Sequence, residues 1–452
     1  MIQINLLNNR FFERYTTLIG NITFFILSIM AVVFWRERTI MLDAAFQSFC
    51  VINKGVLAIQ AQRFGAAFVQ LFPLITSKLG LPLKWVLISY SMSFIIFHYA
   101  LFFICNYILK IKQLAFGILI FTILMTVHTF FWAQNEVVQG TSLVFLYFAF
   151  LINKNRNTKI EWQDYILLIL TLLTTVYFHP LTIFVFTFFI IFFFISTDNI
   201  ISYKKLKLSI IIWLSILLVK ILITRISSYD VGSMERLTNN VKTPLKYLIR
   251  GDGVKLFLAH CLDDFAVTIL IMFLIVVFYY INNNKKKLLF FFFSCLIYIL
   301  IVLVSFYDSK DWFYMESQFL PISVIIILPL IFDILPTLNT RLSLTCVSLL
   351  IAFKLLYIIH ASQFYTKRLQ YLNELLEYTY KFENTKFMAD DEDIDKNKLL
   401  MHWGCAYETP TIPAGQLTGH GRCRRASRRQ CHTYGQRRSS RCDTARASAP
   451  TR

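Results

Sequence analysis

Lysine and arginine occur in every second connection between the hydrophobic stretches of this chain, whereas the short connections between them carry almost no positive charge. In membrane proteins, short loops rich in Lys and Arg stay on the cytoplasmic side. The alternation therefore predicts a chain that crosses a membrane many times, with its N-terminus inside. The basic connections hold Arg10 and Arg14; Lys110 and Lys112; Lys154, Arg156 and Lys159; Lys204, Lys205 and Lys207; Lys285, Lys286 and Lys287; and, more weakly, Arg341.

Composition supports a membrane protein built from helices. Hydrophobic residues make up 57% of the 452 residues and charged residues only 16%, against roughly a quarter charged in soluble domains. Within lipid only a helix or a closed barrel satisfies its own backbone groups, and barrel strands would alternate polar and apolar residues. We therefore expect an all-α integral membrane protein, a polytopic bundle of about eleven transmembrane helices. The expected spans are 17–34, 85–108, 114–132, 137–152, 165–178, 180–196, 208–223, 265–281, 288–306, 319–335 and 342–359.

The stretch 165–196 is interpreted as two short helices that turn at His179–Pro180. Both flanking loops are basic, so an even number of crossings must separate them. Each arm is then only about 21–25 Å long, short for a hydrocarbon core of about 30 Å. Short segments interrupted by proline are tolerated where the backbone lines a cavity in the protein. The pattern therefore draws attention to the turn at His179.

Two long loops are expected on the outer face. The first, 35–84, contains the stretch 64–83, which Gly, Pro and Lys interrupt too often for a confident span. We interpret it as interfacial helices that lie against the membrane. The second loop, 224–264, carries both charge signs. The polytopic domain is thus expected to span residues 1–360.

The C-terminal part divides into two segments of different composition. Residues 361–402 have a helical pattern and then become acidic, and we expect them outside the membrane. Residues 403–452 form an atypical tail rich in Arg, Ser and Cys, which is interpreted as disordered or as read out of frame. Much of the net charge of +19 lies in this tail and in the cytoplasmic loops. Anionic lipid headgroups are the natural partners of such loops, so no nucleic-acid partner is expected.

Short motifs for cofactor or metal chemistry were not found in the sequence. The nine Cys are scattered without a C-x-x-C pair, and no Walker A, HExxH or dinucleotide-binding glycine motif occurs. No metal and no cofactor are therefore expected. An ATP-driven pump has no support from the sequence.

Asp43 is the strongest candidate for chemistry. It follows the first span in the stretch WRERTIMLDAAFQSF, shortly after Arg36 and Arg38. A carboxylate at a membrane mouth can act as a general base on a hydroxyl group, and guanidinium groups match the geometry of a phosphate. The alternative is that Asp43 caps the helix Ala44–Ile52 and that the arginines reach toward lipid headgroups.

Asp43 and the long loop after it resemble the GT-C superfamily of membrane glycosyltransferases, which use polyprenyl-phosphate sugars. These enzymes have many spans, a large first outer loop with interfacial helices, and an essential acidic residue after the first helix. The resemblance covers the architecture of about residues 1–360 and one motif residue, Asp43 in RTIMLDAAFQSF. The family commonly places two acidic residues together, whereas Ala44 follows Asp43 here. The resemblance implies Asp43 as the catalytic base and Arg38 and Arg63 as phosphate contacts.

Four other residues are candidates for lining the substrate cavity: Glu136, His179, Asp308 and Glu316. Glu136 begins a span on the outer side, and its alternative is a solvated turn residue. His179 could bind a pyrophosphate or only cap its turn. Asp308 and Glu316 lie in an aromatic loop that could bind a sugar, or that forms an aromatic belt with solvated charges.

The leading hypothesis is a membrane glycosyltransferase that transfers a sugar from a polyprenyl-phosphate donor to a glycan or lipid acceptor on the extracytoplasmic face. Its expected location is the cell (inner) membrane of a bacterium, in cell-surface polysaccharide synthesis. The alternative is a transporter or flippase for lipid-linked glycans, although few ionisable residues lie within the spans and no internal repeat is visible. A polysaccharide polymerase without the GT-C fold shares the same topology.

Overall fold

The computed structural model of the chain is helical throughout the residues that it describes, and these contain no strand. By length and composition, six described helices can cross a membrane, or seven if one bent pair is counted as a span. The fold is therefore that of an α-helical membrane protein. The structure describes residues 10–60, 62–125, 128–156, 161–196, 200–224, 235, 238–243, 249–306, 312–379, 395, 398–399 and 405–408.

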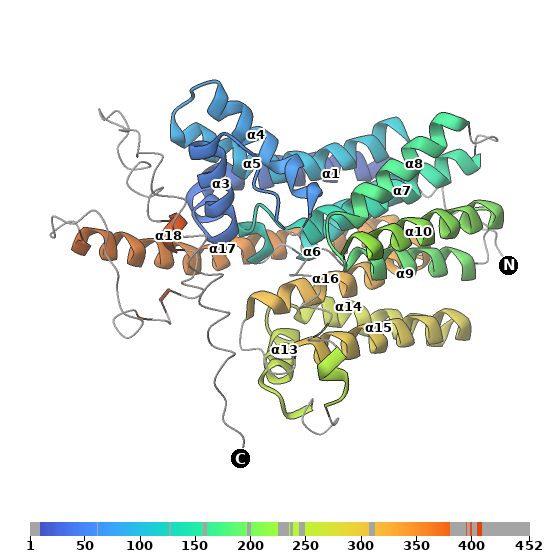
Figure 1. Ribbon diagram of the computed structural model, residues 1–452. Helices are drawn as coiled ribbons and strands as arrows, with labels where there is room; N and C mark the ends of the chain where they lie inside the picture. The colour runs from blue at the N-terminus through green and yellow to red at the C-terminus, as the bar shows by residue number, and fades with distance from the viewer. Residues whose placement is uncertain are drawn as a thin grey trace, which may run out of the picture.

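The main helices run side by side, and shorter ones gather toward the left of Figure 1. Their bounds are α1 Arg10–Val33, α2 Trp35–Thr39, α3 Leu42–Lys54, α4 Ala67–Lys78, α5 Leu83–Phe103, η3 Ile104–Ile108, α6 Lys112–Met125, η4 His128–Phe131, α7 Glu136–Arg156, α8 Trp162–Val176, α9 Thr182–Ile195, α10 Tyr203–Thr224, α13 Asp252–Leu262, α14 Ala266–Ile281, α15 Lys285–Phe306, α16 Trp312–Pro329, η5 Leu330–Ile334, α17 Thr340–Thr379 and α18 Cys405–Glu408.

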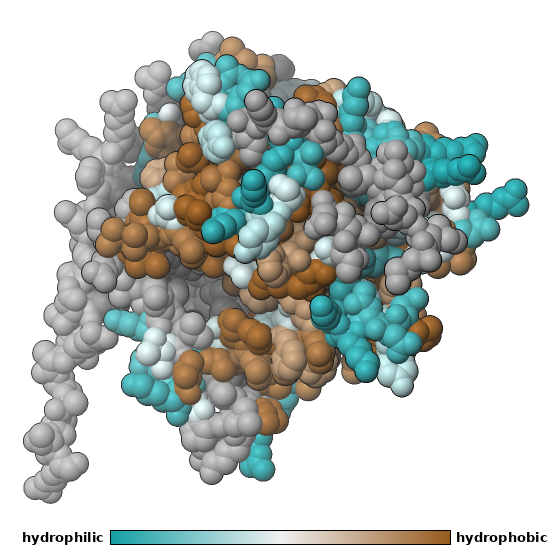
Figure 2. Space-filling view, turned by 90° about the vertical axis from the view of Figure 1, so that its right-hand side faces the viewer, coloured by the Kyte–Doolittle hydropathy of each residue, from teal (hydrophilic) through white to brown (hydrophobic). Residues whose placement is uncertain are grey.

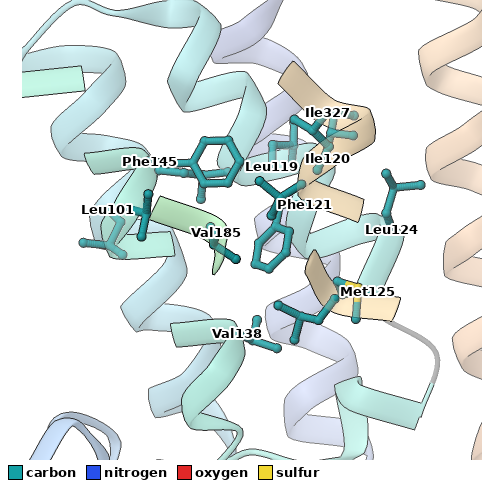
Figure 3. Close-up of a cluster of buried hydrophobic side chains, with 14 of the residues drawn as sticks. Leu101, Leu119, Ile120, Phe121, Leu124, Met125, Val138, Phe145, Val185 and Ile327 are labelled. Carbon is teal, nitrogen blue, oxygen red and sulfur yellow. The ribbon is translucent and has the colours of Figure 1, made fainter. Parts of the chain in front are cut away.

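Helix α6 forms the centre of the bundle. All its residues from Gln113 to Met125 are buried, because α1, α5, α7 and α16 pack around it. Figure 3 shows its side chains Phe121 and Met125 among residues from the neighbouring helices. Close packing of this kind holds membrane helices together, because the hydrophobic effect does not drive helices toward one another within lipid. Gly117 allows it, since a Cβ there would lie 2.7 Å from the Phe145 ring.

Three of the basic connections meet at one end of the bundle. Asn153 donates a hydrogen bond to the Leu109 carbonyl over 2.8 Å, and Lys205 donates to the Lys154 carbonyl over 2.5 Å. Asn155 donates to the Ile200 carbonyl over 3.0 Å. The basic connections that follow the predicted spans 85–108, 137–152 and 180–196 therefore lie at the same end of the bundle, as the alternation of charged loops predicts.

The predicted break within 165–196 is confirmed. Helix α8 ends at Val176 and α9 begins at Thr182, and they are 15 and 14 residues long. The Thr182 hydroxyl donates to the His179 carbonyl over 2.7 Å, which closes the turn between them. Both helices, like α6, are apolar but shorter than the candidate spans. All three lie within stretches that the sequence analysis expects to be spans.

The first loop is folded into short helices rather than a span. Helix α4 has 12 residues and contains Pro73, and it is not among the helices long enough to cross a membrane. Short helices in 64–83 are therefore present as expected, and their placement against the membrane stays a prediction. Helices α3 and α4 lie together at the left of Figure 1, and each packs against a neighbour, α4 on α5 and α3 on both α4 and α18.

The C-terminal region extends the bundle beyond its last predicted span. Helix α17 runs for 40 residues, so the chain continues as one helix through the domain boundary expected at residue 360. Tyr407, within the stretch expected to be a disordered or out-of-frame tail, packs its ring 4.9 Å from that of Phe46. Residues 409–452 lie outside the described part of the chain.

Candidate functional site

Asp43 lies in the first turn of α3, near Arg63. Helix α3 begins at Leu42 with Met41 as its N-cap residue, and its first amide is bound by Glu408, so Asp43 is not the cap. Its carboxylate is partly exposed and makes no hydrogen bond or ion pair to the residues that the structure describes. Burial raises the pKa of Asp43, and the charge of Arg63 opposes that rise. A carboxylate in this state is available to accept a proton.

Arg63 and Glu136 form the charged pair beside it. Arg63 Nη1 lies 3.0 Å from Glu136 Oε2, and the two side chains are only 20% and 17% exposed. Glu136 begins α7, where the positive end of the helix dipole stabilises a carboxylate. Asn135 caps that helix, since its Oδ1 accepts the Val137 amide over 3.1 Å. Glu136 is therefore held by its ion pair with Arg63 and by its place in the capped first turn of α7, rather than lying in a solvated turn.

His179 approaches this pair because two glycines let its neighbour pack closely. Phe178 lies against Gly65 and Gly140, and a Cβ at these positions would come within 2.3 Å and 2.8 Å of Phe178 atoms. Any larger residue would push the first loop or α7 away from the turn. Arg63 is two residues from Gly65, and Glu136 is one helical turn from Gly140. Phe178 thereby joins the first loop, α7 and the α8–α9 turn.

The proton of His179 can be placed on Nε2. The Leu181 amide donates to His179 Nδ1 over 3.1 Å, so Nδ1 is an acceptor and the neutral ring carries its proton on Nε2. Burial lowers the pKa of His179 well below its usual value, and the charges of Arg63 and Lys220 lower it further. His179 is therefore a neutral hydrogen-bond donor at the edge of the site.

Tyr90 of α5 forms the inner wall. Its hydroxyl donates to Gln47 Oε1, on the helix that carries Asp43. Both side chains are buried, and Tyr90 interacts electrostatically with Asp43 and with Glu136. This contact fixes α3 against α5, and so fixes the distance of Asp43 from the bundle.

Arg38 lies deeper than the sequence suggested. Its side chain is fully buried, and its guanidinium donates to Ser91 Oγ over 2.7 Å, to the Ser91 carbonyl over 3.0 Å and to the Phe130 carbonyl. The Phe130 ring covers it at 4.1 Å. Burial lowers the pKa of Arg38 to about 9, so it remains cationic at neutral pH. No described carboxylate pairs with it, and its charge interacts with the buried His98 rather than with Asp43, Glu136 or His179.

The residues just before Asp43 and Arg63 have a strained backbone. Leu42, just before Asp43, has φ +43°, and Gln62, just before Arg63, has φ +58°. Residues with side chains rarely adopt this left-handed region, and such strain concentrates at functional sites. The Leu42 amide donates to Glu408 Oε1 over 2.7 Å, and Arg368 binds both Glu408 oxygens, at 2.7 and 3.0 Å. The docked α18 thus holds the start of α3.

A second polar cluster, which the sequence analysis did not identify as a unit, surrounds His260. His260 Nδ1 lies 2.6 Å from Asp264 Oδ2, and Lys354 Nζ lies 3.4 Å from the Asp264 carbonyl. Burial would raise the pKa of Asp264, but the hydrogen bond from His260 and nearby charges keep that pKa low. His128 interacts electrostatically with both. These residues come from three separate segments, and only the His260–Asp264 spacing of four is visible in the sequence.

The structure thus brings together Asp43, Arg63, Glu136 and His179 and keeps Arg38 buried behind them. Asp308 lies outside the described residues, and Glu316 lies in α16 without a described side chain. The grouped residues offer a proton acceptor, a cation and a neutral donor, which suits transfer to a hydroxyl group from a donor with an anionic leaving group.

Comparison with known proteins gives no match: no protein-family model, no curated protein and no solved structure resembles the chain closely enough to be counted as similar.

Proposed function

We propose that the protein is a membrane glycosyltransferase that uses a polyprenyl-phosphate sugar and acts at the end of the bundle opposite the basic loops. The observation that carries the proposal is Asp43, a partly exposed carboxylate of raised pKa without a partner among the described residues. A structural carboxylate in a half-buried position is normally paired or hydrogen-bonded.

In this mechanism Asp43 takes the proton of the acceptor hydroxyl. The acceptor oxygen then attacks the anomeric carbon, the bond from that carbon to the phosphate oxygen breaks, and polyprenyl phosphate leaves with the bonding electrons. The sugar is transferred with inversion. Arg63 stabilises the charge that develops on the leaving phosphate, since an arginine held in place beside it needs no reorganisation during the reaction.

Glu136 and His179 position the reacting groups. Glu136 keeps the Arg63 side chain in one orientation through the 3.0 Å contact. His179 donates a hydrogen bond from its Nε2–H to a substrate oxygen and keeps the proton. Arg38 supports the packing behind the site and does not touch the substrate, because its hydrogen bonds are directed to Ser91 and Phe130.

The proposed topology has about eleven crossings, with the N-terminus and the basic loops in the cytoplasm. The shorter helices α6, α8 and α9 then also cross the membrane, with α6 enclosed by the surrounding helices. The site lies on the extracytoplasmic face of the cell membrane. The polyprenyl chain of the donor stays in lipid while its phosphate reaches Arg63.

The test uses the full chain in membrane vesicles supplied with polyprenyl phosphates that carry radiolabelled hexoses. Asp43→Asn should lower the transfer rate by about 100-fold or more while binding of polyprenyl phosphate is retained. The matched control is Asp252→Asn, which alters a 51% exposed carboxylate of α13 and should leave transfer unchanged. Full transfer by the Asp43→Asn protein would rule out the proposed base.

Transport of lipid-linked glycans would give a different result in the same vesicles. A flippase would move the labelled lipid across the bilayer without releasing polyprenyl phosphate, and it would do so with Asn at position 43.

A further inference from the structure

A second polar region lies next to the basic loops, at the end of α1 that is farther from Asp43. A depression of about 360 Å³ opens there between α1 and η3. The proposed transfer site uses none of its residues. Its walls are Glu13, Thr17, Asn106, Tyr107, Lys110 and Lys112.

Polar side chains continue from this depression along the surfaces of two candidate spans. Asn106 Nδ2 donates to the Thr17 hydroxyl over 3.0 Å, and Asn21 donates to the Tyr107 hydroxyl over 2.9 Å. Tyr99 donates to Asn21 Oδ1 over 3.3 Å. Polar groups within spanning segments are costly in lipid, and where they occur they mark binding sites or contacts. The row of polar groups here points toward the depression.

Of the two lysines that line the depression, Lys110 is available to bind a ligand. Lys112 Nζ lies 2.7 Å from Glu13 Oε2 and is thereby neutralised. Lys110 is exposed and makes no hydrogen bond or ion pair to the described residues. It follows a π-helical turn, Ile104–Ile108, and has φ +56°. Such turns occur often at functional sites, and here the irregular backbone turns Lys110 into the rim of the depression.

The surroundings indicate a lipid rather than a soluble ligand. Exposed apolar side chains continue the surface on both sides, with Leu18 and Ile22 on α1 and Phe103 and Ile108 on the facing segment. Figure 2, which looks at the molecule from the right-hand side of Figure 1, shows hydrophilic patches set directly among hydrophobic surface. A phosphate held at Lys110 would place acyl chains along that apolar surface.

We propose that this depression binds the phosphate-bearing headgroup of an anionic lipid from the leaflet on the basic side. Lys110 contacts the phosphate as a charge, and Tyr107 and Asn106 contact oxygens of the headgroup. The acyl chains lie against α1. This site is independent of the proposed transfer reaction, because it needs none of Asp43, Arg63 or Glu136.

The test measures lipid retained by the purified full chain, by native mass spectrometry after mixing with phosphatidylglycerol or phosphatidylcholine. We expect preferential retention of phosphatidylglycerol, reduced about fivefold in Lys110→Asn. Asparagine tolerates the left-handed backbone at this position, so the substitution removes the charge with little strain. The matched control is Lys204→Asn, an exposed lysine of another basic connection, which should retain the lipid as the wild type does.

Two results would overturn the proposal. Equal losses in both variants would show that attraction to the basic face is diffuse. Displacement of phosphatidylglycerol by millimolar inorganic phosphate, with no dependence on acyl chains, would identify a free-phosphate site. An unchanged melting temperature of Lys110→Asn ensures that a loss of retention reports on binding.

Discussion

Asp43 and Arg63 are coupled, since each is within electrostatic reach of the other and neither is fully exposed. Burial pushes the Asp43 pKa up and the guanidinium pulls it down. The balance determines the pH at which the proposed base becomes ionised. Glu136 adds a second negative charge nearby and is itself held by Arg63.

Replacing Arg63 by Gln should move the acid limb of the pH–rate profile to higher pH. Arg63 lowers the Asp43 pKa, so its removal raises that pKa, and the ionised base appears only at higher pH. The maximal rate should also fall by about tenfold or more, because the charge on the leaving phosphate loses its partner. The profile of vesicle-catalysed transfer checks both effects, and an unmoved acid limb would show that Arg63 does not act on the titrating group.

Phe178 determines how closely three elements approach one another. Gly65→Ala should destabilise the protein by roughly 1–3 kcal/mol and reduce transfer, because a Cβ there would overlap the Phe178 ring. Phe178→Leu in the same chain removes ring atoms and should restore part of both. Thermal unfolding in detergent and the transfer assay provide the measurements. A Gly65→Ala protein as stable as the wild type would contradict the packing described for the turn.

The contribution of helix α18 to the stability of the fold can be tested by shortening the chain from its C-terminus. Arg368 and Glu408 are buried, with side chains 2% and 0% exposed. Deleting residues 403–452 leaves Arg368 without that partner and should cost roughly 3 kcal/mol or more. Deleting only residues 409–452 keeps this ion pair and should give the higher melting temperature of the two shortened chains. Equal melting temperatures of the two shortened chains would show that α18 does not belong to the fold.

The elements themselves were largely predictable, and the contacts between them were not. Hydrophobic runs predict helices because lipid leaves few other options, and charge parity located the break at His179. The Arg63–Glu136 pair joins residues 73 positions apart, and the burial of Arg38 depends on Ser91 and Phe130. Neither leaves a periodic signal in the sequence. Arg38 and Arg63 therefore look alike in the sequence, although the structure places Arg63 at the surface of the site and Arg38 behind it.

At the scale of the whole molecule, the two ends of the bundle differ in chemistry. One end gathers the basic connections through bonds such as that from Lys205 to the Lys154 carbonyl. The other carries the short helices of the first loop and the Asp43 site. Under the proposed topology, the substrate of such an asymmetric bundle enters from the face opposite the basic loops.

Transfer in oriented vesicles tests this account most directly. A sugar acceptor that cannot cross the membrane is added to right-side-out and to inside-out vesicles that contain the labelled donor. We predict that the wild-type chain labels the acceptor only in right-side-out vesicles and that Asp43→Asn labels it in neither. Labelling by Asp43→Asn at the wild-type rate, or labelling only in inside-out vesicles, would contradict it.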